Sequence, residues 1–267
     1  KLVNPMAEDM QELRTCISQN LLKVAVQNCS QRNHRLGLFE TGTVFLGRPS
    51  ANSDLTHKEE LHLGVLTGGL QETNWKNKSK MADFFEMKGV LAGLEEAFRF
   101  KLDLRHGDCN EPKWDSDQFR EIYFGETRLG FIAMVNSRYL KKRKIHFPLA
   151  IMEIKLEPIL GAKPNELTFQ EIPQFPSADK QLALITPRDL PASEVLEAIS
   201  ALKLPTLENH YIFDLYKGKE IHSDSKSLGI HFVFRGENKT LSENEMGDSI
   251  RKILNCLHQK YQIVLRP

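Results

Sequence analysis

The sequence predicts an α+β protein made of two parts, and two observations support this prediction. Stretches rich in branched and aromatic residues alternate with amphipathic helical stretches along the 267 residues. In the last third of the chain the expected order is strand, helix, strand, strand, helix, strand, which is the split βαβ arrangement. Such a domain packs two helices on one face of its sheet and leaves the other face open.

Length and composition place the chain among ordinary globular proteins. Its length allows one large domain or two ordinary ones, and its 40% hydrophobic and 27% charged residues argue against disorder. No apolar run approaches the roughly 18 residues that a membrane span requires. The net charge is only +1, so any RNA contact would have to come from local basic patches.

Cysteine usage and the chain start suggest a cytoplasmic protein. The four cysteines, Cys16, Cys29, Cys109 and Cys256, include no CxxC pair, which argues against a zinc site and against a disulfide framework. The sequence opens KLVNPM, with neither an initiator methionine nor the features of a secretory signal. We therefore expect the C-terminal piece of a longer cytoplasmic protein.

In the first part, one helix is expected over 18–28 and another begins after Asp83, a suitable helix cap. The expected strands cover 36–46, 61–67, 118–124, 128–135 and 150–156. The stretch 105–117 is expected to be irregular. Residues 157–167 contain two prolines and a glycine, which indicates a connection between domains.

Two basic features of the first part have competing interpretations. Arg14 could clamp a phosphate, but an anchoring role through a carboxylate is favoured. The run 139–144 (YLKKRK) could neutralise several phosphates. It could equally form a short helix with a favourable cationic C-terminal end that faces a partner subunit or solvent.

No catalytic constellation is evident. A nucleophile needs a nearby base, and none of the nine histidines accompanies a GxSxG elbow or a cysteine-protease signature. Gly68-Gly69 lacks both the Walker and the GxGxxG spacing. Glu95 and Glu96 are adjacent and so point apart on a helix, while Asp83 has its capping role. We expect no catalytic residue and no metal site in this chain.

The second part is expected to start near residue 168. Its expected strands cover 180–186, 212–221, 227–235 and 261–265, and its expected helices cover 192–202 and the stretch after a cap at Thr240 or Ser242. Leu228, Ile230, Phe232 and Phe234 alternate with other residues and should face the core. By the same spacing, Phe213 is expected in the core.

Outward positions of this hairpin are candidates for RNA contact. Tyr216 could stack a splayed base, and lysines could hold the RNA backbone beside it. The candidate RNA-binding residues are Tyr216, Lys217, Lys219, Lys226, His231, Arg235 and Lys239. The competing interpretation is an ordinary sheet edge that carries solvated charges.

Several ordered motifs resemble the C-terminal part of the bacterial phenylalanyl-tRNA synthetase beta subunit. FDLYKG, SKSLGIHFVFR, TLSENE and the final VLR resemble its ferredoxin-fold anticodon-binding domain, and 4–22, 38–45 and 83–89 resemble the part just before it. The resemblance implies a class II synthetase-like module with a mixed or antiparallel sheet over 1–160, which is non-catalytic. A linker over 161–167 and a ferredoxin-like βαββαβ domain over 168–267 would follow.

The same resemblance implies a functional setting. The complete enzyme is an (αβ)2 assembly that joins phenylalanine to tRNA-Phe with ATP and magnesium, and its chemistry belongs to the alpha subunit. This chain would support the alpha subunit and dock tRNA-Phe in the cytoplasm. It would bind no cofactor of its own and contact neither membrane nor DNA.

The sequence departs from the family in two regions. Trp114-Asp-Ser-Asp and Met134-Val-Asn-Ser stand where the family has a His-Pro-Gly-like turn and a Gly-Glu-Leu-His-Pro-like ending. Asp179-Lys180 stands near the place of an Arg-Asp pair. With these departures and a net charge near zero, the chain could instead be a protein-interaction scaffold that has lost tRNA binding, and this alternative stays open.

Overall fold

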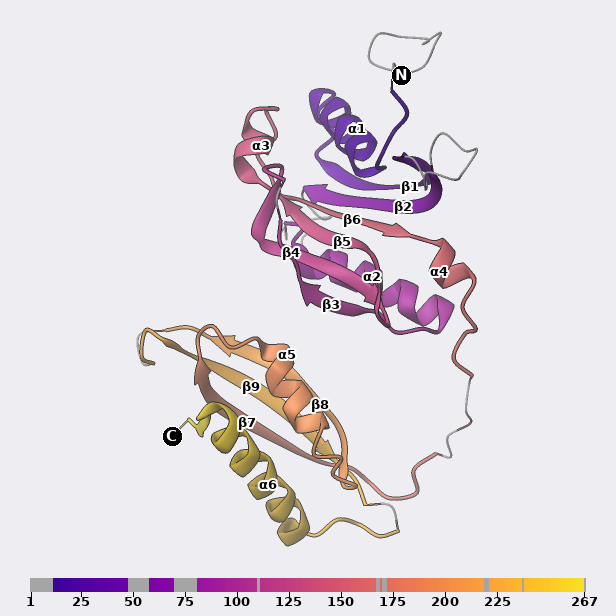
Figure 1. Cartoon of the computed structure of the whole chain (residues 1–267). Coiled ribbons are helices and arrows are strands. Elements are labelled where there is room, and N and C mark those ends of the chain that lie inside the picture. Colours follow the sequence, from indigo (N-terminus) through magenta and orange to yellow (C-terminus); the bar gives the residue numbers. More distant parts are fainter. Residues whose placement is uncertain are drawn as a thin grey trace. The chain divides into compact units, whose positions relative to one another are not determined.

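The computed structural model describes residues 12–47, 58–69, 81–109, 111–166, 169, 172–218, 221–236 and 238–266. The chain divides into two compact units, Lys1–Leu167 and Thr168–Pro267. Each unit has its own sheet (Figure 1). The first unit has a hydrophobic core on each face of its sheet, and the second unit has one core. Among the described residues, no helix is long and apolar enough to cross a membrane.

The first unit is built on a six-stranded sheet with the order β1-β2-β6-β5-β4-β3, in which every pair is antiparallel. Its strands are β1 (Arg35–Leu46), β2 (Lys58–Gly69), β3 (Asp103–His106), β4 (Trp114–Phe124), β5 (Thr127–Val135) and β6 (Leu149–Lys155). All five expected strands are present. The α+β prediction with a mixed or antiparallel sheet is therefore confirmed for this unit.

The expectation of irregular structure over 105–117 is wrong at both ends of that stretch, whereas residues 107–109 and 111–113 lie in neither a helix nor a strand. The edge strand β3 and the first residues of β4 lie at these ends. The signal was weak because β3 is short, pairs only with β4 and has no buried residue.

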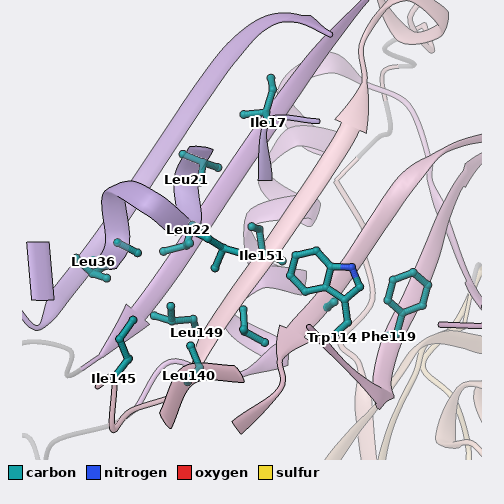
Figure 2. Packing of buried hydrophobic residues seen from close by; sticks show 14 of the residues in the cluster. Ile17, Leu21, Leu22, Leu36, Trp114, Phe119, Leu140, Ile145, Leu149 and Ile151 are labelled. Carbon is teal, nitrogen blue, oxygen red and sulfur yellow. The ribbon is translucent and has the colours of Figure 1, made fainter. Parts of the chain in front are cut away.

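Helices cover both faces of this sheet. α1 (Ser18–Ser30) packs on one face through Leu21, Leu22 and Ala25, and α2 (Phe84–Phe98) packs on the other through Met87 and Leu91. Adjacent residues of β6 alternate between the two cores, as a pleated strand requires. Figure 2 shows the first core, with Leu22 beside Ile151 of β6.

The helix starts follow the sequence closely. Asp83 caps α2, as predicted, because its Oδ1 accepts a hydrogen bond from the backbone N–H of Glu86 at 2.9 Å. Two short helices, α3 (Ser137–Lys141) and α4 (Glu157–Leu160), complete the unit. α4 occupies the beginning of the stretch that the sequence indicates as a connection.

The second unit has the predicted βαββαβ order. Its elements are β7 (Ala178–Pro187), α5 (Ala192–Ser200), β8 (Leu207–Tyr216), β9 (Ser225–Phe234), α6 (Glu243–Tyr261) and β10 (Val264–Leu265). The antiparallel sheet order is β10-β7-β9-β8. Residues from α5 and α6 enclose one core with the even-numbered residues of β9, among them Phe232 and Phe234, whose exposure is 0%. Among the described residues, no helix of this unit packs on the other face of the sheet.

The strand expected over 212–221 instead covers Leu207–Tyr216, and Phe213 is not a core residue. Its side chain is 50% exposed. A β-bulge between Ile212 and Asp214 is the physical reason, because the extra residue breaks the alternation on which the prediction rests. Asp214 and Tyr216 pair with Gly229 and Ser227, so they lie on the face away from the helices, as predicted.

Candidate nucleic-acid interface

The open face of the second sheet carries the candidate site, and the central strand β9 contributes small residues to it. Ser227 and Gly229 of β9 lie between strands that carry larger side chains. A methyl group on Gly229 would come within 3.0 Å of the Phe213 ring and 2.9 Å of the Asp214 Cβ. A side chain at position 229 would therefore displace the ring that lies there.

One end of this face holds a tyrosine covered by a cation. Tyr216 is partly buried, and the guanidinium carbon of Arg266 lies 4.8 Å from the centre of its ring. The backbone N–H of Arg266 donates to the carbonyl of Ala183 at 2.8 Å, which fixes the residue after β10 beside β7. Tyr216 is a predicted site residue. Arg266 is not, although it belongs to the VLR motif at the chain end.

The other end holds a stacked pair of rings. Tyr211 of β8 lies over His231 of β9, with ring centres 5.0 Å apart and an interplanar angle of 10°. Gln181 lies within hydrogen-bond distance of His231 Nδ1, at 3.1 Å, and an Asp179 carboxylate oxygen is 3.6 Å from Nε2. His231 is a predicted site residue. Tyr211 is missed because the strand was expected to begin one residue later.

Three of the cationic side chains predicted to bind RNA form hydrogen bonds or ion pairs within the second unit. Lys226 donates to the carbonyls of Arg188, at 2.9 Å, and Leu190, and burial together with nearby Lys217 lowers its pKa. Arg235 bonds Glu208 at 2.9 Å and the carbonyl of Phe175. Lys239 pairs with Glu245 at 2.6 Å, beside the start of α6. Their side chains hold loops and helix ends.

The remaining predicted residues are at the end of β8. Lys217 is exposed directly after the strand. Lys219 lies outside the described residues. The structure therefore brings Tyr216 and His231 onto one face, adds Tyr211, Phe213 and Arg266 to it, and distributes Lys226, Arg235 and Lys239 elsewhere.

A charged cavity of about 490 Å³ in the first unit is a second candidate. His62 lies in its wall between two carboxylates, with Nδ1 2.8 Å from Glu153 and Nε2 3.3 Å from Glu60. Lys155 pairs with Glu60 at 2.8 Å. Glu153 accepts the backbone N–H groups of Ile17 and Ser18, at 3.0 and 2.9 Å, where α1 begins.

The charges of this cluster balance one another. Burial alone would lower the pKa of His62, but its hydrogen bonds to Glu153 and Glu60 outweigh burial and raise that pKa above 6.5. Burial likewise opposes ionisation of Glu60, yet Lys155, Lys58 and His62 lower its pKa to about 2. Because each group has a partner, the cluster is a structural network that ties α1 to the sheet. Within the described ranges, no group of three or more His, Cys, Asp or Glu is arranged to hold a metal ion.

Arg14 has the anchoring role that was favoured over a phosphate clamp. Its guanidinium pairs with Glu40 and donates to the carbonyl of Thr43 at 2.8 Å. Both partners belong to β1. The arginine therefore ties the segment before α1 to the edge of the sheet through a carboxylate.

Comparison with known proteins gives a consistent match for each part. Residues 1–156 match the family model described as the phenylalanyl tRNA synthetase beta chain CLM domain, and residues 173–266 match the ferredoxin-fold anticodon binding domain. The phenylalanine--tRNA ligase beta subunit of Bacillus cereus is 27% identical over 266 residues, which cover 99% of this chain and 32% of the relative. That of Photorhabdus laumondii is 30% identical over 267 residues, which cover 99% and 33%.

Among solved structures, a pyrrolysyl tRNA synthetase from Desulfitobacterium hafniense matches 55% of this chain and 48% of its own, with 18% identity and a TM-score of 0.38. The chain spans about a third of the length of the curated relatives that it matches.

Proposed function

From the premise that this chain belongs to the phenylalanyl-tRNA synthetase beta chain family, we propose that it is the non-catalytic, C-terminal part of such a beta subunit and docks tRNA-Phe. Membership confirms the family to which the motifs point. The second unit would be the anticodon-binding domain, and the first would be the module that supports the catalytic alpha subunit.

The activity belongs to the assembled enzyme in this proposal. The complete (αβ)2 assembly would join phenylalanine to tRNA-Phe in the cytoplasm. ATP and magnesium would act at the alpha subunit. Relatives named as phenylalanine--tRNA ligase beta subunits support this setting, and the four free cysteines fit a reducing compartment.

The observation that carries the tRNA proposal is the group of rings on a sheet face that α5 and α6 leave open. Tyr211 and Phe213 are 45% and 50% exposed, and they share this face with Tyr216. Stacking one base on an aromatic ring contributes about 1–3 kcal/mol and tolerates different bases. Exposed flat rings on an open sheet face can stack splayed bases, which is how single-stranded RNA loops are recognised.

Charge on this face would come from few residues. We propose Lys217 and Lys219 as contacts to the RNA backbone and Arg266 as the cation beside Tyr216. Lys226, Arg235 and Lys239 would act indirectly, because their hydrogen bonds hold loops of the same unit. With few cations, stacking rather than charge would dominate the affinity of this face.

The test is binding of a labelled tRNA-Phe transcript to the whole chain, compared with the Tyr216→Ala variant. Loss of the ring should weaken binding by about tenfold, the lower half of the stacking range. Tyr216→Phe should keep most of the affinity because it keeps the ring. Tyr123→Ala, in the first unit, is a matched control that removes a tyrosine elsewhere. Equal affinity of Tyr216→Ala and the unaltered chain would contradict the proposed site.

A protein-interaction scaffold that has lost tRNA binding is the second candidate. The internal pairing of Lys226, Arg235 and Lys239 favours it, since these cations are not aimed at the open face. The scaffold predicts no tRNA binding at low salt, either alone or after addition of the alpha subunit. Binding that requires the alpha subunit would instead favour docking within the assembly.

A further inference from the structure

Neither the packing of the first unit nor the proposed function explains one basic turn of this unit. It consists of Arg138, Lys141, Lys142, Arg143 and Lys144, and we call these five residues the cationic turn. All five are exposed. No Asp or Glu occurs in the sequence between Glu126 and Glu153, so the charge of this segment has one sign.

The turn has a defined shape rather than being a loose tail. Leu140 and Ile145 are 4% and 2% exposed, so they anchor it to the core on both sides of the lysines. The Asn136 side chain caps α3 by accepting the backbone N–H of Arg138 at 2.9 Å. The guanidinium of Arg143 lies 3.6 Å from the ring centre of Tyr139. The backbone that carries the cations is therefore held in place by these contacts.

Five cations are crowded in this turn without a carboxylate beside them. Over the described residues, no ion pair joins any of the five cations to a carboxylate. Lys58, Lys113 and Lys155, by contrast, each lie within 2.8 Å of a carboxylate oxygen. Crowded like charges repel one another over the Debye length of roughly 8 Å at physiological salt. A polyanion bound there would relieve this repulsion and release counterions.

An adjoining cavity distinguishes between polyanions. It measures about 340 Å³, and its lining includes Lys141, His146 and one carboxylate, Asp115, beside the apolar side chains of Leu140, Ile145 and Phe147. This volume lies at the small end of the roughly 300–1,000 Å³ of small-molecule sites. A nucleobase has apolar faces that such walls can cover, whereas the carboxylates of an acidic peptide would gain nothing from them.

We propose that the cationic turn is a second RNA-binding surface, which holds phosphates of a single-stranded or looped segment while one base enters the adjoining cavity. It is separate from the open face of the second unit. Only the choice of tRNA-Phe as the RNA to test rests on the proposed function. The dipole of α3 does not explain the turn, because a helix of five residues has a small dipole.

The test measures the salt dependence of binding of fluorescent tRNA-Phe transcript to the whole chain. The variant Lys141→Gln, Lys142→Gln, Lys144→Gln leaves both apolar anchors and Arg143 in place. Each lost phosphate contact should reduce the slope of log Kd against log salt by about one, so the slope should fall by up to about three. Affinity at 150 mM salt should fall by more than about tenfold.

The matched control is Lys88→Gln, Lys101→Gln, Lys252→Gln. These lysines are also exposed, and both variants lower the net charge from +1 to −2, since each loses three cations. A control that weakens binding as much as the turn variant would overturn the proposal, because net charge alone would then explain the loss. Lys141→Arg, Lys142→Arg, Lys144→Arg should keep the slope of the unaltered chain.

The outcomes for the two RNA surfaces can be told apart. If Tyr216→Ala weakens binding but the turn variant matches its control, this inference fails and the proposed function stands. If the turn variant weakens binding and Tyr216→Ala does not, the inference stands and the open-face site fails. If poly-glutamate binds the unaltered chain but not the turn variant, while the turn variant binds tRNA as tightly as its control does, the turn binds acidic protein and the RNA proposal is wrong. No tRNA binding at 50 mM salt would also overturn it.

Discussion

At the scale of single residues, His62 links the stability of the first unit to pH. Its pKa is raised in the folded chain above the usual 6.5, because its hydrogen bonds to Glu153 and Glu60 outweigh the effect of burial. The folded state therefore binds this proton more tightly than the unfolded state does. The resulting stability is fully present below pH about 6.5 and is lost as pH rises through the raised pKa.

We expect His62→Gln to remove this pH dependence. Below pH 6.5 the variant should unfold with a free energy lower by about 3 kcal/mol, since it leaves the buried Glu153 without its charged partner. The difference should shrink as pH rises above 6.5. Urea unfolding from pH 5.5 to 8.5 measures this, and parallel curves for the two proteins would show that His62 does not carry the effect.

Gly229 offers a second test at this scale. In Gly229→Ala the new methyl group would press on Phe213 and Asp214 at about 3 Å. We expect a loss of about 1–2 kcal/mol of unfolding free energy from overpacking, together with weaker tRNA binding. Gly89→Ala is the control: its methyl group meets nothing within 4 Å, so in a helix interior it should stabilise by about 0.5–1 kcal/mol. Similar effects at both positions would contradict the argument.

At the scale of elements, α6 depends on its N-terminal capping box. The Ser242 side chain accepts the backbone N–H of Glu245, and the Glu245 side chain accepts the backbone N–H of Ser242. Hydrogen bonds from Lys239 and Ser242 lower the pKa of Glu245 to about 2. Its contribution is therefore present above pH about 4.5 and is lost as pH falls toward 2.

We expect Ser242→Ala to lower the free energy of unfolding of the second unit by about 1 kcal/mol. The cap satisfies a backbone donor that alanine leaves without a protein partner. Ser242→Thr should stay close to the unaltered chain because it keeps the hydroxyl. Circular dichroism during thermal unfolding gives the comparison, and an unchanged midpoint for Ser242→Ala would show that the cap contributes nothing.

Elements with a regular apolar period were predictable from the sequence, and the misses have local causes. β9 alternates without interruption, and α6 begins with a Ser-x-x-Glu pattern. β8 was misplaced because its exposed aromatic residues resemble core residues in the sequence. Its bulge, moreover, cannot be recognised from residue types alone. In the candidate site, Tyr216 and His231 were predicted from the alternation of inward and outward residues along the strands. Arg266 was missed because the pairing of β10 with β7 places it beside Tyr216. The register of that pairing cannot be predicted from the sequence.

At the scale of the whole molecule, the chain has separate cores in its two units. Ile253 and Leu257 of α6 belong to the core of the second unit, whereas Trp114 lies in a core of the first unit. We expect Ile253→Ala to destabilise the second unit by about 2–5 kcal/mol. The first unit should remain folded.

Near-ultraviolet circular dichroism and tryptophan fluorescence in a Trp75→Phe background test this, since Trp114 is then the one tryptophan of the chain, is 4% exposed and reports on a core of the first unit. An unchanged Trp114 signal beside reduced helix stability is the expected result. A simultaneous loss of both signals would show that the two units fold as one cooperative system.

The bulge between Ile212 and Asp214 divides β8 into two segments of opposite phase. Before it, the open face is occupied by Asn209 and Tyr211; after it, by Asp214 and Tyr216. A substitution in one half therefore leaves the orientation of the other half unchanged. The two ends of the proposed RNA-binding face can diversify independently, and removal of a single residue at the bulge would turn one whole set of its side chains inward.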